Sequence, residues 1–527
     1  MEPILSLTPA GIARAVVLTT ALLAPLGGCG GGGSNGNGPG TAGAGHDGGG
    51  ALDATTSGAN GDGGAGGDGS PSDSSFTFTC GTVSDCQVTC GDGGPDAGTT
   101  SLSGTVYDPA GKVPLYNVIV YIPTTAVQPV TTGASCDPCG GDVTGNPLVS
   151  ALTDADGDFV LDNVPVGIPI PLVMQLGKWR RQVTLPAIPS TAACTNTTVS
   201  NTDLTRLPRN QGEGDLPQIA LTTGGADPLE CLLRKVGISD SEFGTAGDPV
   251  RVHLYTGAGV PYVTPPLVAT SAFASAVDNG ATFALATNLW DSSTNLAAYD
   301  IVLMACEGQP TLAAPDAGTG NAGTKPPVAL QAMYAFESTG GRVFASHWHD
   351  YWFENGPAPL PLTGTWTDVT PPPPDPAYGT IDTSFPKGQA FYDWMQNNGG
   401  LEADGTMQIY QPKDNLSTTG LGSQQWVTLA NPNTTPPGQT AVQYMSFNTP
   451  LDVDAGAQCG RVVYSDLHVS SGATDDAGVP LGDRTGEPFP TGCVTTDLSP
   501  QEKALEFMLF DLSSCIQSDD SMPQVPP

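Results

Sequence analysis

The feature that most constrains the fold is a series of short, almost wholly apolar segments in the second half of the chain. Four of them read "IALTT", "DIVLMA", "RVFAS" and "RVVYS", and helical patterns lie between them, the last beginning after Ser499 as its N-cap. Strands that are apolar throughout and alternate with helices are typical of a mostly parallel sheet covered on both faces. We therefore expect residues 206–515 to form a three-layer α/β domain.

The preceding region, residues 76–205, has the alternating pattern of an all-β domain. It contains G-x-V-x-D at 104–108, T-D-x-x-G-x-F at 153–159 and V-P-x-G at 164–167. These motifs resemble the carboxypeptidase regulatory-like domain, a transthyretin-like β-sandwich, and the resemblance implies a structural or binding module. The "DADGD" stretch at 154–158 has carboxylate spacing that resembles a calcium loop, but a hairpin turn explains it better because the rest of the ligand set is missing.

The N-terminus reads as an export signal. Residues 1–28 contain the apolar run "AVVLTTALLAPL" and lead through "LGG" to Cys29, a pattern that resembles a bacterial lipobox. The resemblance implies that Cys29 is acylated and anchors the protein in a membrane, and Gly30 favours the outer membrane. An ordinary secretory signal is the alternative. Residues 29–75 are rich in Gly and poor in apolar residues, so we expect a disordered tether.

Charge and cysteine content limit the function classes. The formal net charge is −35, which opposes binding to phosphate backbones, so nucleic acid is excluded as a partner. With Cys29 acylated, eleven of the twelve cysteines remain, and in an oxidising envelope we expect mostly disulfides, with one thiol left over. The "CDPC" pair at 136–139 is assigned to disulfides rather than to zinc. The basic cluster 178–181 is either a contact for an anion or glycan or a packing strip, and residues 516–527 are expected to be disordered.

Polar residues follow four of the apolar segments. The candidates are Asp227, Cys306 with Glu307, the stretch His347–Asp350, and Asp466 with His468. Ligands of open α/β sheets bind at the carboxyl ends of the strands, so we expect these groups to converge.

Two of these strand ends also carry a family resemblance. "GGRVFASH" and "GRVVYSDLH" are similar to patterns of the ThuA-like group within the class I glutamine amidotransferase-like superfamily, which implies a flavodoxin-like fold. In amidotransferases the strand after the Gly-Gly ends in a nucleophilic cysteine, whereas this chain has Ser346–His347 there. The two modules together resemble a family of bacterial envelope lipoproteins.

Three chemical hypotheses follow for the strand ends. In the first, His347, His349 and His468 bind a divalent metal with Asp466 or Asp350. In the second, Cys306 is a nucleophile activated by His347 and oriented by Glu307. In the third, the histidines are framework residues and no cofactor is needed. An aromatic cluster then either packs or binds a sugar, and its candidate residues are Trp348, Tyr351 and Trp352, with Asp227 beside them.

The function expected from these observations is that of an envelope lipoprotein acting as a binding or structural module, with glycans as candidate ligands. The alternative is a ThuA-like enzyme of carbohydrate or amide chemistry. The sequence leaves open whether the chain is an enzyme, and the periplasmic and surface-exposed locations stay equally open.

Overall fold

The computed structural model describes residues 80–91, 98–258, 268–309, 325–367, 371–468 and 482–526, which belong to one compact unit, 75–527. The protein is sheet-rich, with several sheets and few helices. Among these residues no helix has the length and apolar character needed to cross a membrane. The predicted signal segment, Cys29 and the tether lie outside the described residues.

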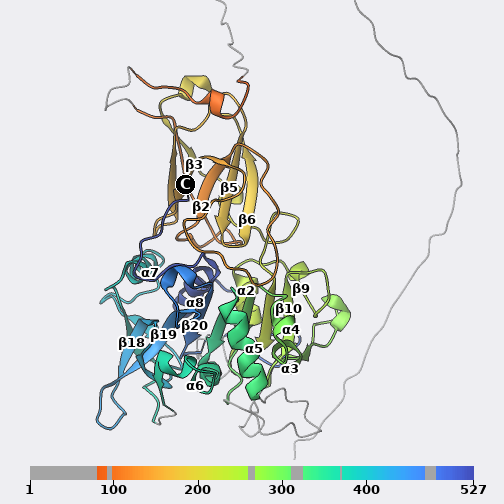
Figure 1. Cartoon of the computed structure of the whole chain (residues 1–527), viewed down its shortest axis with the longest axis vertical. Coiled ribbons are helices and arrows are strands. Elements are labelled where there is room, and N and C mark those ends of the chain that lie inside the picture. Colours follow the sequence, from red (N-terminus) through yellow and green to blue (C-terminus); the bar gives the residue numbers. More distant parts are fainter. Residues whose placement is uncertain are drawn as a thin grey trace, which may run out of the picture. The chain divides into compact units, whose positions relative to one another are not determined.

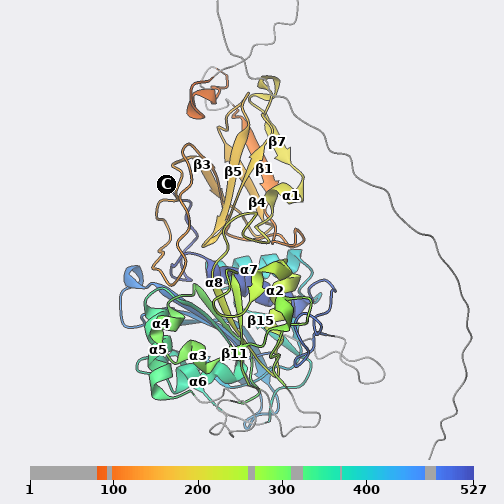
Figure 2. The same ribbon diagram turned by 90° about the vertical axis from the view of Figure 1, so that its right-hand side faces the viewer.

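The first half of the unit contains two β-sheets, one with β2, β3, β5 and β6 labelled in Figure 1 and the other with β1, β4 and β7 labelled in Figure 2. One has the order β4-β1-β7, and the other the order β3-β2-β5-β6. The strands are β1 (Ser101–Thr105), β2 (Ile119–Pro123), β3 (Pro147–Leu152), β4 (Asp158–Asp162), β5 (Ile170–Leu176), β6 (Trp179–Leu185) and β7 (Asn196–Val199). Buried side chains of both sheets belong to a single hydrophobic cluster, as expected of an all-β region.

The turn at 154–158 corrects one expectation. It does not close a hairpin, because β3 pairs with β2 and β4 pairs with β1, so the turn carries the chain from one sheet to the other. The Asp154 carboxylate accepts hydrogen bonds from the backbone N–H groups of Asp156 and Asp158 at 2.9 and 3.0 Å. Its carboxylate therefore stabilises the turn, as Asp side chains commonly do.

The second half is built on an eleven-stranded mixed sheet of order β11-β10-β8-β12-β13-β20-β19-β18-β15-β16, with β9 beside β10. In the sheet, β11, β10, β8, β12, β13 and β20 run parallel to one another, and β9 is parallel to β10. Each of β19, β18, β15 and β16 is antiparallel to the strand before it in this order. The parallel strands are β8 (Ile219–Thr223), β9 (Phe243–Gly244), β10 (Val252–Thr256), β11 (Ala284–Leu285), β12 (Ile301–Met304), β13 (Arg342–Ser346) and β20 (Gly460–Ser465). The antiparallel strands are β15 (Ala377–Ile381), β16 (Met407–Ile409), β18 (Ser423–Asn431) and β19 (Gln439–Thr449). A separate pair joins β14 (Gly364–Trp366) to β17 (Leu416–Thr419).

Helices cover both faces of this sheet because its strands are buried on both sides. In β12, Ile301 and Leu303 belong to one hydrophobic cluster, and Val302 and Met304 belong to another. Figure 2 shows α2 (Leu229–Lys235), α7 (Pro386–Asn397) and α8 (Pro500–Ser513) on one side of the sheet. On the other side lie α3 (Thr287–Trp290), α4 (Ser293–Leu296), α5 (Pro327–Ser338) and α6 (Tyr351–Glu354). A short helix, α1 (Thr202–Thr205), precedes this half.

The N-cap predicted at Ser499 is confirmed. Its hydroxyl accepts the Glu502 backbone N–H at 3.2 Å, and the Glu502 carboxylate accepts the Ser499 N–H at 2.8 Å, forming a capping box.

Ten cysteines form five disulfides, and among the described residues only Cys306 is free. The two cysteines of "CDPC" do not pair with each other. Cys136 bonds Cys459 and Cys139 bonds Cys515, so both link the β-sandwich half to the α/β half. The expectation of disulfides here is confirmed, and their connectivity joins the two halves covalently.

The C-terminal segment and the basic cluster are also packed. Residues 516–526 were expected to be disordered, yet Ile516 is buried and Asp519 forms an ion pair with the buried Arg461 guanidinium at 2.7 Å. Arg461 and Lys387 are two buried cations that share the carboxylates of Asp511 and Asp519, so the tail supplies the second of these carboxylates. In the basic cluster, Lys178 pairs with Asp300 and Arg180 pairs with Asp215, so these cations serve packing.

Candidate functional site

Four neighbouring strands bring the candidate residues together. β8, β12, β13 and β20 are adjacent and parallel, so their carboxyl ends lie at one edge of the sheet. Asp227 follows β8, Cys306 follows β12, His347 follows β13 and His468 follows β20. Glycine is required at position 224, after β8, because the backbone after β12 approaches it closely. A Cβ on Gly224 would lie 2.1 Å from the Cys306 carbonyl oxygen.

A sharp turn after β13 aims His347 into the cluster. β13 ends at Ser346, and His347 has φ +42°, a left-handed conformation that is uncommon for a residue with a Cβ. Its Nδ1 lies 3.4 Å from Cys306 Sγ and 3.0 Å from His468 Nε2. One ligand atom from each of the three side chains lies within 4.8 Å of the others. The three side chains are 0–7 % exposed.

The carboxylate of Asp227 lies behind this cluster. Asp227 Oδ2 accepts hydrogen bonds from the Ser346 hydroxyl and from the Cys306 backbone N–H, while Oδ1 lies 4.0 Å from His468 Nδ1. Among the described residues, that nitrogen is buried and has no hydrogen-bond partner. Carboxylates that accept this N–H orient metal-binding histidines, and at 4.0 Å the Asp227 carboxylate lies just beyond hydrogen-bond distance.

Residues 411–416 also border the site, and the sequence did not predict this. The Lys413 backbone N–H donates to Asp466 O at 2.9 Å, and the Leu416 N–H donates to Asp466 Oδ2 at 3.1 Å. The Asn415 side-chain amide donates to Asp350 Oδ2 at 2.9 Å. No motif marks this segment, because it reaches the site only through antiparallel strands that follow β13 in the chain.

The titratable groups of the cluster are held neutral. Burial lowers the pKa of His347 well below its usual value, and the neighbouring His468 adds to that effect. Burial likewise lowers the pKa of His468 to about 4, with Asp227 opposing it. Burial, and then the Asp227 charge, raise the pKa of the Cys306 thiol far above its usual value. At neutral pH the cluster therefore holds two neutral imidazoles and a thiol.

Three other predicted site residues lie outside this cluster. His349 Nε2 contacts Ala305 O at 2.9 Å, and its Nδ1 accepts from the Trp352 indole at 3.1 Å, so both nitrogens are engaged elsewhere. Asp466 accepts from the Tyr464 hydroxyl and from Leu416, and burial raises its pKa to about 8. Glu307 forms a fully buried ion pair with Lys325 at 2.9 Å and does not orient His347. His349 and Asp466 thus do not join the cluster, in which Cys306 lies beside His347 and His468.

The aromatic residues divide into buried and partly exposed. Trp352 is 1 % exposed and packs edge-on against Trp290, so its ring faces are covered. Trp348 and Tyr351 are partly exposed, and the Trp348 ring lies 4.7 Å from the His347 ring. This packing does not support a sugar-binding surface that includes Trp352.

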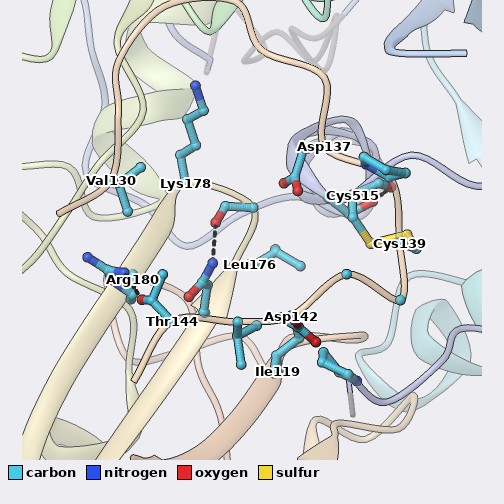
Figure 3. Close-up of a pocket in the computed structure, with 18 of the residues that line it drawn as sticks. Ile119, Val130, Asp137, Cys139, Asp142, Thr144, Leu176, Lys178, Arg180 and Cys515 are labelled. Carbon is cyan, nitrogen blue, oxygen red and sulfur yellow. Dashed lines mark hydrogen bonds between the residues drawn. A yellow bond between two sulfur atoms is a disulfide. The ribbon is translucent and has the colours of Figure 1, made fainter. Parts of the chain in front are cut away.

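A separate pocket lies against the β-sandwich (Figure 3). Its volume is about 360 Å³, and Ile119, Leu176 and the Cys139–Cys515 disulfide are among the groups that line it. Lys178 and Arg180 also line it, but their charges are already paired with Asp300 and Asp215. The pocket therefore offers no unpaired cation for an anionic ligand.

Compared with known proteins, the chain matches no family model, no curated protein and no solved structure. The site's geometry therefore carries the functional argument.

Proposed function

We propose that this chain is a cell-envelope binding protein whose α/β half holds a divalent transition-metal ion, such as Zn²⁺, on Cys306, His347 and His468. The observation that carries the proposal is the convergence of one thiol and two imidazole nitrogens within 4.8 Å of one another. Each of these groups is a preferred ligand of zinc and similar ions.

The distances fit such an ion. Around a tetrahedral Zn²⁺, ligand atoms stand about 3.3–3.7 Å apart, given bond lengths of about 2.0–2.3 Å. The contacts of His347 Nδ1 with Cys306 Sγ and His468 Nε2 are 3.4 and 3.0 Å, so small side-chain rotations admit the ion.

The electrostatics also support a cation. Both imidazoles are neutral at pH 7 because burial lowers their pKa values, so their lone pairs are available to a metal. A bound ion deprotonates a coordinating thiol, and the buried Asp227 carboxylate lies next to the place where positive charge would be added.

A thiol enzyme is the second candidate. The 3.4 Å contact between Cys306 Sγ and His347 Nδ1, with the Gly308 N–H also 3.4 Å from the sulfur, favours it. The thiolate, however, is disfavoured by burial and by Asp227, and a catalytic cysteine requires the opposite shift. The metal site accounts for the same contacts without an unpaired buried thiolate.

The broader assignments support an envelope role. The strand order β10-β8-β12-β13-β20 is 2-1-3-4-5 in chain order, which is the order of flavodoxin-like sheets and supports a ThuA- or amidotransferase-like module. The turn at His347 falls where amidotransferases carry their nucleophile, so we propose that a metal ligand has replaced it. Five disulfides support an oxidising location, and with the lipobox-like Cys29 they favour an outer-membrane lipoprotein.

The test is elemental metal analysis of the whole mature chain, purified without a tag or chelator. The whole chain is needed because disulfides join its two halves. The variants are Cys306→Ser, His468→Ala and His347→Asn, the last chosen because Asn tolerates a positive φ better than Ala. We expect about one ion per chain in the parent and near-complete loss in each variant.

His253→Gln is the control, because it removes a histidine that bonds Tyr299 and Asp248 instead of the cluster. It should keep the ion. A parent that binds no Zn²⁺, Cu²⁺ or Co²⁺ after dialysis against each would refute the metal centre.

A further inference from the structure

The backbone of His347 adopts a conformation that is uncommon for a residue with a Cβ. Its φ is +42°, in the left-handed region. Such conformations persist where the surrounding structure holds them, and they are common at functional sites. The neighbours of His347 must therefore supply the interactions that keep this turn.

The peptide units on both sides of the His347 Cα are held in place. On the N-terminal side, Ser346 is the last residue of β13 and pairs with Ser465 of β20. On the C-terminal side, the Tyr464 hydroxyl donates to His347 O at 3.0 Å. Because each peptide unit is planar, holding both units fixes φ and ψ of the residue between them, and with these angles the direction of its Cβ. The Tyr464 hydroxyl thus helps to aim the His347 side chain.

Tyr464 is itself firmly packed. Its side chain is 0 % exposed, and its ring lies edge-on to the rings of Trp366 and Phe353, with centroids 5.4 and 6.1 Å away. Its hydroxyl also lies 2.9 Å from Asp466 Oδ1. A phenol oxygen can donate one hydrogen bond and accept others, so one hydroxyl can join both groups. Tyr464 is therefore a rigid support for the turn at His347.

The conformation of His347 also decides which histidine joins the cluster. On a regular strand, His347 and His349 would point to the same face. In the structure, His347 Nδ1 reaches Cys306 Sγ and His468 Nε2 at 3.4 and 3.0 Å. His349 instead contacts Ala305 O at 2.9 Å. An interaction that holds the His347 backbone therefore bears directly on the set of metal ligands.

We propose that Tyr464 is a positioning residue of the metal centre: by holding His347 O, its hydroxyl keeps the His347 imidazole aimed into the cluster before an ion arrives. This inference rests on the proposed metal centre. Hydrogen bonds from the surrounding residues orient metal ligands in this way, and ligands that are already oriented need no rearrangement when the ion binds.

A tyrosine that only packs would give a different result. Removal of its hydroxyl would destabilise the metal-free and the metal-bound protein equally, so the metal affinity would not change. Loss of a positioning hydroxyl lets the turn relax in the metal-free protein. Only the fraction of molecules with the turn formed then binds the ion well, and the apparent affinity falls by that fraction.

The test is titration of the metal-free, whole mature chain with Co²⁺, followed by the absorption spectrum of the bound ion, in the parent and in Tyr464→Phe. The substitution removes one oxygen atom and keeps the ring, so the packing around it is retained. Loss of the hydrogen bond to a buried carbonyl should weaken Co²⁺ binding about tenfold. Urea unfolding of the metal-free proteins, measured in parallel, separates this effect from a change in stability.

The matched control is Tyr255→Phe. Tyr255 is also a buried tyrosine of this sheet, and its hydroxyl lies 2.7 Å from that of Tyr299 instead of contacting the cluster. This variant should lose stability but bind Co²⁺ as the parent does.

The possible results separate the two proposals. If Tyr464→Phe binds Co²⁺ as tightly as the parent, or if Tyr255→Phe weakens binding to the same extent, Tyr464 has no positioning role and the metal centre stands. If the parent does not bind Co²⁺, both proposals fall.

Discussion

At the scale of single residues, the Cys306 thiol sets the pH dependence expected of the proposed metal binding. Burial raises its pKa far above neutrality, while the pKa values of His347 and His468 lie below neutrality. Zn²⁺ must therefore displace the thiol proton and displaces none from the imidazoles. We predict release of about one proton per ion near pH 7, with affinity rising as pH rises from about 5 to 8.

Calorimetric titration in two buffers of different ionisation enthalpy measures this number directly. Cys306→Ala offers a comparison, because it removes the thiol proton, so any Zn²⁺ that this variant still binds should release close to none. Release of two protons would show that an imidazole is protonated in the free protein, contrary to the neutral cluster described above.

The sequence predicted which strand ends meet, but it could not predict the ligand set. His347 and His349 are two residues apart, a spacing that points both to one face of a regular strand. The positive φ at His347 begins a 3₁₀ turn instead, which sends His349 to Ala305 O. A single backbone angle thus removed one predicted ligand. Lys413 and Asn415 were not predicted because their contacts depend on tertiary pairing.

At the scale of elements, the parallel strands and long helices were predictable because their apolar patterns are strong. The helical pattern expected after the cap at Ser499 matches α8. The antiparallel extension β19-β18-β15-β16 was not predicted as part of the same sheet. Pairing of those strands is non-local, so no pattern along the chain specifies which edge they join.

Helix α8 also carries a buried carboxyl group against the β-sandwich half. Glu506 is 0 % exposed and lies close to Asp108, which is 1 % exposed. Burial raises the Asp108 pKa to about 6, and burial together with Asp108 raises the Glu506 pKa far above its usual value. Among nearby charges, Lys503 lowers the Glu506 pKa and Glu502 raises it.

The sign of the pH effect follows from these shifts. Both acids have folded-state pKa values above their unfolded values of about 4, so stability from this pair is full below about pH 4 and falls as pH rises through 6. We predict that Glu506→Gln stabilises the protein at pH 8 by about 1–3 kcal/mol and has little effect at pH 4. Urea unfolding at both pH values measures the difference.

Glu354→Gln, on the exposed surface of α6, is the matched control and should show no such dependence. The prediction is wrong if the difference in unfolding free energy between the parent and Glu506→Gln is the same at pH 4 and pH 8. The two carboxyl groups would then not be protonated in the folded state.

At the scale of the whole molecule, the two halves share one core instead of being joined by a linker. One hydrophobic cluster includes Leu176 and Trp179 of the β-sandwich half together with Phe507 and Phe510 of α8. The Trp179 and Phe510 rings lie 5.7 Å apart, and the Trp394 indole donates to Pro114 O at 2.7 Å. The sequence suggested two domains because the motifs are separate, and it could not show that their surfaces are buried against each other.

Two disulfides reinforce this shared core, and their geometry predicts that their effects are coupled. With Cys136–Cys459 intact, Cys139–Cys515 closes a ring of only about 60 residues, and the reverse also holds. With the first bond absent, the second closes a ring of about 114 residues, 92 from Cys139 to Cys231 and 22 from Cys493 to Cys515, because Cys231–Cys493 still bridges the chain. Loop-closure entropy grows with the logarithm of loop length, so either bond restricts the unfolded chain more when it acts alone.

We therefore predict that removing both bonds with Ser substitutions destabilises the protein by about 0.5 kcal/mol more than the sum of the single removals. Urea unfolding of the parent, the two single-bond variants and the double variant forms the thermodynamic cycle that measures this coupling. As a control, the same cycle made with Cys80–Cys86, which closes a separation of six residues, should be additive with Cys139–Cys515. If the losses of unfolding free energy in the first cycle are additive, the coupling is absent. The two halves would then stay associated in the unfolded state, and neither bond would limit the conformational freedom of the unfolded chain.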